Sequence, residues 1–115
     1  RVVDERAFTA RLARFFGTHR DVLVGIGDDA AVVVPRGRGT VLCCDPVIEG
    51  VHFRSDAPPQ LVGRKAVNRN LADLAAMGAT ADWLLVSLIL PRGYPARSPS
   101  ALLRGLRAAA RRGGA

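Results

Sequence analysis

Lysine, aromatic residues and cysteine are all scarce in this chain of 115 residues. Only one of the 17 basic residues is a lysine, and aromatic residues make up 5% of the sequence, although the net charge is +7. Modules that bind nucleic acids more often combine lysines and aromatic side chains in a compact patch, because phosphates and bases are contacted together. We therefore attribute the charge to a general preference for arginine, and we do not expect nucleic acid as a partner.

Other absences narrow the class of protein. Cys43 and Cys44 are adjacent, without the C-x-x-C spacing of a zinc or redox site, so we expect buried thiols in a reducing compartment. No apolar run approaches the ~20 residues that span a membrane, and no amino-terminal segment has the pattern of a secretory signal. We expect a cytoplasmic protein of one domain that does not bind a membrane.

Three segments have the apolar spacing of amphipathic helices, and they begin near Asp4, Pro58 and Ser98. Asp4 is expected to cap the first helix, which Gly17 ends. In the second helix, which should run to Met77, Asp56 is expected to act as the cap, with prolines in the first turn. Gly105 is a weak point in the third helix, because glycine has a low helix propensity.

Short apolar segments predict the strands. Residues 31–35 and 40–44 flank a glycine-containing loop at 36–39, which predicts a β-hairpin. The nearly continuous apolar run at 83–90 predicts a strand that is buried on both faces. Together with the helices, these segments predict an α+β fold with a small mixed or antiparallel sheet flanked by helices.

The predicted hairpin would bring carboxylates together. Its outer ends carry Asp28 and Asp29 on one side and Asp45 on the other. Such a cluster is costly unless a cation neutralises it, and Mg²⁺ prefers carboxylate, water and phosphate oxygens. The sequence thus indicates a candidate magnesium site. Aspartates are also common turn residues, so solvated turn acids are the alternative.

Three motifs in order carry a family resemblance. They are GIGDDAA at residues 25–31, DPVIEGVHF at 45–53 and NLADLAAMGA at 70–79. With this order the chain resembles thiamine-monophosphate kinases, which share a superfamily with aminoimidazole ribonucleotide synthetase and selenophosphate synthetase. The resemblance implies that residues 1–115 are the amino-terminal, ATP- and magnesium-binding domain of an aminoimidazole ribonucleotide synthetase-like fold. It also implies a separate carboxy-terminal domain, without which the fragment would be inactive.

The resemblance implies roles for particular residues. Asp29, Asp45 and Asp73 match magnesium-binding aspartates of the family, and His52 matches a residue near the phosphorylated substrate. Each has a simpler alternative. Asp73 can pair with Arg69, four residues before it on the same helix, and His52 can be a half-buried structural histidine. Asp28 is expected to be a turn acid.

The sequence departs from the family pattern beside Asp45. Cys43, Cys44 and Pro46 stand where the family commonly has hydroxyl residues. Thiols are poor ligands for Mg²⁺, so either backbone carbonyls and waters replace the hydroxyls or one metal position is weakened. Cys43 and Cys44 are accordingly additional candidate metal contacts.

The resemblance implies an enzyme that uses ATP and Mg²⁺ to convert thiamine monophosphate to thiamine diphosphate. It also implies a homodimer formed through the sheet, which would cover the apolar strand at residues 83–90. Two alternatives remain open. One is another ATP-using enzyme of the superfamily, and the other is a non-catalytic nucleotide-binding or assembly domain, which the cysteines beside Asp45 would suit.

Overall fold

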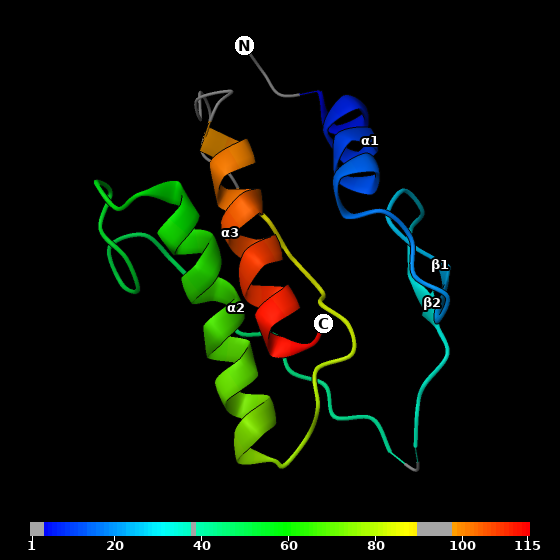
Figure 1. The fold of residues 1–115 in the computed structure, drawn as a ribbon. Coiled ribbons are helices and arrows are strands. Elements are labelled where there is room, and N and C mark those ends of the chain that lie inside the picture. The colour runs from blue at the N-terminus through cyan, green and yellow to red at the C-terminus, as the bar shows by residue number, and fades with distance from the viewer. Residues whose placement is uncertain (1–3, 38, 90–97) are drawn as a thin grey trace. The chain divides into compact units, whose positions relative to one another are not determined.

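The computed structural model describes residues 4–37, 39–89 and 98–115 (Figure 1). The chain divides into two compact units, Arg1–Thr40 and Val41–Ala115. The elements in chain order are α1 (Glu5–Phe16), β1 (Val22–Val24), β2 (Val32–Val33), α2 (Pro59–Ala76) and α3 (Ser98–Gly113). Helices and a small antiparallel sheet confirm the α+β class. No helix among the described residues is long and apolar enough to cross a membrane.

Helix α1 begins and ends at the predicted residues. The Asp4 carboxylate accepts hydrogen bonds from the backbone N–H groups of Arg6 and Ala7, at 3.0 and 3.5 Å. These N–H groups have no partner within the helix, so the cap stabilises its first turn. Gly17 follows the last turn with a φ of 74° and donates its N–H to the carbonyl of Ala13. Both terminal signals are therefore confirmed.

The sheet of the first unit pairs β1 with β2 in antiparallel orientation. Beyond the paired residues, Val34 donates its N–H to the carbonyl of Asp21 at 2.8 Å. The Arg36 guanidinium also donates to the Asp21 carboxylate. This hydrogen bond is the main reason that the pKa of Asp21 lies below its usual value. One backbone hydrogen bond and one side-chain hydrogen bond, both to Asp21, thus hold the start of β1 to the segment after β2.

The predicted hairpin of residues 31–35 and 40–44 is wrong. β2 pairs with the earlier strand β1, and residues 40–44 belong to no helix or strand. The chain reverses at residues 25–31, where Gly27 has a φ of 125°, a conformation that favours glycine. Asp28 and Asp29 therefore lie in the connection between β1 and β2, and the hairpin no longer supplies an argument that they meet Asp45.

The core of the second unit is the contact between α2 and α3, which lie side by side in Figure 1. Buried apolar side chains, each at most 8% exposed, come from these two helices: Val62, Val67, Leu102, Leu103, Leu106, Ala109 and Ala110. Burial of these groups supplies the main driving force for holding the pair together.

Two glycines let the backbones of α2 and α3 touch. A Cβ atom added at Gly63 would overlap the carbonyl oxygen of Leu102, and one added at Gly105 would overlap that of Gln60. Gly105 is therefore required for packing, a role that its low helix propensity does not reveal.

The start of α2 confirms one expectation and corrects another. Proline occupies the first turn, as predicted, but Pro58 stands at the cap position and no side chain caps the helix. Asp56 instead accepts two hydrogen bonds from Arg54, at 2.9 and 3.2 Å. The arginine competes for the carboxylate, and its hydrogen bonding is the main cause that lowers the pKa of Asp56.

The predicted strand at residues 83–90 is also not found. Residues 83–89 belong to no helix or strand, and Leu90 lies outside the described residues. Leu85, Val86 and Ile89 are 67%, 48% and 92% exposed, so burial on both faces is wrong for this segment. A strand forms only when its backbone groups find a partner, and the described part of the second unit offers none to these residues.

The glycine contact gives a stability prediction. Gly63→Ala and Gly105→Ala should each lower the free energy of unfolding by roughly 1–3 kcal/mol, because overpacking forces the helix backbones apart. Alanine has the higher helix propensity, so the expected sign is opposite to the local preference. Urea denaturation measures the change. Gly39→Ala is the control, because nothing lies within 4 Å of the added Cβ. A stabilised Gly105→Ala variant would show that the backbones do not touch.

Candidate functional site

Asp45 is held at its backbone by the Asn70 side chain of α2. Asn70 Oδ1 accepts the N–H of Asp45 at 2.8 Å, and Nδ2 donates to the carbonyl of the same residue at 3.2 Å. Nδ2 also donates to the carbonyl of Ala66 at 2.9 Å, one turn earlier in the helix. The amide has two donor hydrogens and one acceptor oxygen, so it satisfies both backbone groups of Asp45, much as a neighbouring strand would.

The Asp45 side chain pairs with Arg69, the residue before Asn70 in α2. Arg69 Nη2 donates to Asp45 Oδ2 at 2.6 Å, and the two side chains are 37% and 44% exposed. At this exposure the pair contributes at most about 1 kcal/mol to stability. The alternative that Arg69 pairs with Asp73 is wrong, because the guanidinium turns to Asp45. A carboxylate predicted to bind a cation thus already has a cationic partner from α2.

Cys43 strengthens the same attachment. Its Sγ donates to the backbone carbonyl of Asn70 at 3.6 Å, and the residue is half-buried. Cys44 is exposed, and both thiols are free. The expectation of two buried cysteines is therefore wrong for Cys44. That either thiol contacts a metal stays a prediction.

His52 lies in a compact turn near the other end of the same motif. The ring Nδ1 of His52 accepts the backbone N–H of Ile48 at 3.0 Å, and the backbone N–H of His52 donates to the Ile48 carbonyl at 2.8 Å. Lys65 of α2 donates to the carbonyl of His52. Because Nδ1 is the acceptor, the neutral imidazole carries its proton on Nε2. His52 therefore combines a structural bond with a second nitrogen that can donate.

Asp29 lies in the other unit. The backbone N–H of Asp29 donates to Asp28 Oδ1 at 2.9 Å, which agrees with Asp28 as a turn acid. Asp29 is exposed. Asp45 and Asp73 belong to the second unit. Within residues 4–37, 39–89 and 98–115, no three His, Cys, Asp or Glu side chains form a group able to hold a metal ion. Convergence of the three aspartates stays a prediction.

The sequence interpretation missed the part that α2 has in the site. Lys65 and Arg69 are four residues apart and hold His52 and Asp45, respectively, while Asn70 fixes the backbone at Asp45. The available signal was the position of Asn70 at the start of the third motif, next to a cation. Helical spacing alone does not show which distant segment such side chains contact.

The Asn70 contact gives a second stability prediction. Asn70→Ala should destabilise the second unit by about 1–3 kcal/mol, because the N–H and carbonyl of Asp45 lose partners in a half-buried position. Asn68→Ala is the matched control on the same helix, since Asn68 is exposed, and it should change stability by less than about 0.5 kcal/mol. Thermal unfolding compares the two variants. Equal effects would show that the Asn70 bonds do not hold the Asp45 segment.

Comparisons with known proteins agree on one family. The family profile described as "AIR synthase related protein, N-terminal domain" matches residues 27–115. A thiamine-monophosphate kinase of Mycobacterium tuberculosis is 43% identical over 103 residues, which cover 89% of this chain and 31% of the relative. The Escherichia coli and Bacillus subtilis enzymes of that name are 41% and 38% identical, covering 70% and 76% of this chain and 26% and 28% of the relatives. The chain thus spans less than a third of these relatives. No solved structure matches it significantly.

Proposed function

The chain belongs to the family of AIR synthase related proteins, through their N-terminal domain, and from its similarity to thiamine-monophosphate kinases we propose that the intact protein is such a kinase. It would transfer a phosphate group from ATP to thiamine monophosphate and release ADP and thiamine diphosphate. The observation that carries the proposal is the 38–43% identity to enzymes of that name. Direct hydrogen bonds between the Asp45 motif and the Asn70 motif, which are far apart in sequence, support it.

Phosphoryl transfer depends on positioning and on neutralising charge, because the protein contributes little covalent chemistry. Asp29, Asp45 and Asp73 would hold Mg²⁺, which neutralises the charge of the nucleotide phosphates when bound. The donor chemistry fits, since these are carboxylates at least partly accessible to solvent and hard cations prefer such oxygens. The hydrogen bond from Arg69 goes to Oδ2 of Asp45, so Oδ1 is the oxygen that would face a cation. The two hydrogen bonds from Asn70 to the Asp45 backbone would fix the position of this carboxylate.

His52 would contact the phosphorylated substrate. Its Nδ1 is used by Ile48, so the neutral ring offers Nε2–H as a donor to a phosphate oxygen. Lys65 fixes the backbone of the same residue. These contacts would orient the ring without using the nitrogen that would face the substrate.

A cytoplasmic location of the protein stays a prediction.

An activity assay with one substitution tests the proposed function. The intact protein that carries this chain should form thiamine diphosphate from ATP, Mg²⁺ and thiamine monophosphate. Asp45→Asn keeps the shape but removes the charge, so turnover should fall by roughly 100-fold or more, while the free energy of unfolding changes by at most about 1 kcal/mol. Asp56→Asn, at an exposed aspartate that is also paired with an arginine, is the control and should keep its turnover.

Two results would contradict this proposal in different ways. If the folded Asp45→Asn protein keeps its activity and only stability falls, then Asp45 is structural. If the unmodified protein forms no thiamine diphosphate but turns over another substrate with ATP, then another enzyme of the superfamily is the correct assignment.

The ion pair of Arg69 with Asp45 favours a second candidate, a non-catalytic nucleotide-binding or assembly domain, because the carboxylate is already neutralised. Mg²⁺ and ATP binding without turnover would select a nucleotide-binding domain, and failure to bind either would select an assembly domain.

We further propose a homodimer formed through β-structure. In the first unit, Leu23 and Val32 of the sheet and Val34 beyond it are 66%, 47% and 45% exposed. A two-stranded sheet is marginally stable alone and gains from strand partners and a covered face. Exposed apolar side chains on the sheet therefore suit a contact with a second copy of the chain.

Sedimentation of the intact protein at micromolar concentration should give a dimer. Leu23→Glu places a charge on the exposed face of β1 and should shift the protein towards monomer, because burying an unpaired charge is costly. Met77→Glu is the control, at a residue that is 70% exposed and lies outside the sheet. A monomer in the unmodified protein, or equal dissociation of both variants, would contradict pairing through the sheet.

A further inference from the structure

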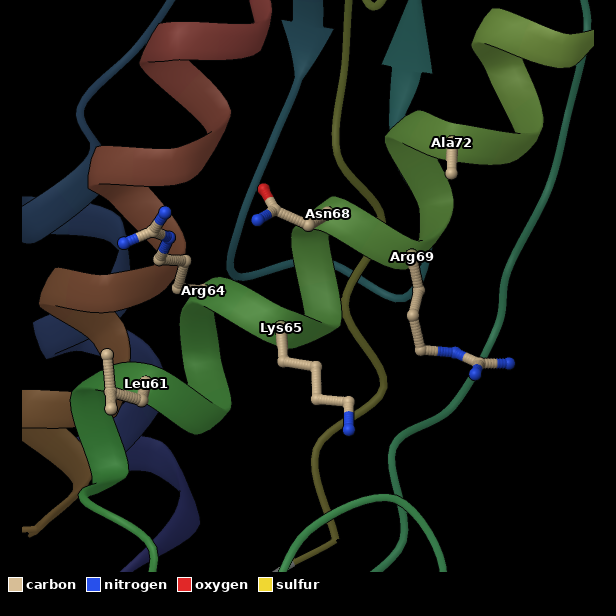
Figure 2. A pocket seen from close by; sticks show the side chains of 6 residues that line it. All are labelled: Leu61, Arg64, Lys65, Asn68, Arg69 and Ala72. Atoms are coloured by element: carbon tan, nitrogen blue, oxygen red, sulfur yellow. The ribbon is translucent and has the colours of Figure 1, made fainter.

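A groove with a volume of about 450 Å³ runs along α2. We call it the α2 groove, and it is lined by Leu61, Arg64, Lys65, Asn68, Arg69 and Ala72. Figure 2 shows Lys65 and Arg69 extending from the helix in the same direction, while Arg64 and Asn68 extend towards the other edge. The groove is therefore bordered on both sides by side chains that donate hydrogen bonds.

The charge of the α2 groove is strongly one-sided. Three of its six lining residues are cationic and none is acidic. Lys65 and Arg69 are four residues apart on the helix, a spacing at which like charges repel, and the Asp45 carboxylate paired with Arg69 offsets part of this repulsion. Arg64 has no ion pair within the described part of the chain. An anion in the groove would offset this repulsion.

Two of the three cations are already fixed in position. Lys65 donates to the carbonyl of His52, and Arg69 donates to the carboxylate of Asp45. These contacts reduce the entropy that is lost when the side chains bind a ligand. They also place the groove beside two residues proposed for the kinase site.

We propose that the α2 groove binds a phosphoryl group without the help of a metal ion. Arginine and lysine suit the oxygens of a phosphate anion, and Asn68 supplies an uncharged donor. The proposal rests on the proposed function for the physiological source of this group, which is either thiamine monophosphate or ATP. Binding of the phosphate itself does not depend on that function.

Calorimetric titration of the intact protein in EDTA tests the groove. Inorganic phosphate is the first probe, and thiamine monophosphate and ATP in the same buffer identify the source. Arg64→Gln and Lys65→Gln should each weaken phosphate binding about three- to fivefold, as expected for partly exposed charge contacts. Arg104→Gln carries the same charge change at an exposed position of α3 outside the groove, and it should leave the affinity unchanged. Circular dichroism confirms that each variant is folded.

The outcomes separate this proposal from the kinase proposal. The groove is supported if phosphate binding depends on Arg64 and Lys65 but not on Arg104, even if no thiamine diphosphate is formed. It is overturned if phosphate does not bind saturably, or if all three variants weaken binding equally, since general attraction to a basic protein would then account for the result. Unchanged affinity in Arg64→Gln and Lys65→Gln also overturns it, including in a protein that is an active kinase.

Discussion

The close approach of two helix backbones at Gly63 and Gly105 is the constraint on which the second unit depends. The buried apolar side chains lie between α2 and α3, and their packing requires that neither glycine carry a side chain. This contact fixes the position of α2. The other side chains of α2 then act from a rigid support, with Asn70 and Arg69 holding Asp45 and with Lys65 holding His52. Packing on one side of the helix thus determines geometry on the other.

Features set by local sequence were predictable. Asp4 and Gly17 bound α1 as expected, because capping and glycine termination involve residues only a few positions apart. The prolines at the start of α2 were equally informative. The ordered motifs also indicated the family, which the match over residues 27–115 shows.

Features set by distant partners were not predictable. Residues 31–35 and 40–44 looked like a hairpin, but β2 pairs with β1, because strand pairing depends on competition among segments. Gly105 looked like a weakness, although the neighbouring backbone requires it. Pairing of Arg69 with Asp73 at helical spacing was the simpler alternative for Asp73, yet Asp45 competes for the guanidinium from 24 positions away. The hydrogen bonds from Asn70 to the Asp45 backbone were equally unpredictable, since no local pattern shows which backbone an amide will contact.

The proposed role of Asp45 is that of a cation ligand that α2 holds in place. The most direct measurement is anomalous diffraction from crystals of the intact protein grown with Mn²⁺ and ATP. Mn²⁺ takes the same oxygen ligands as Mg²⁺, so this role predicts an anomalous peak in contact with the Asp45 carboxylate while Asn70 still bonds to the Asp45 backbone. A bound nucleotide whose metal lies elsewhere, with Asp45 still paired only to Arg69, would contradict it.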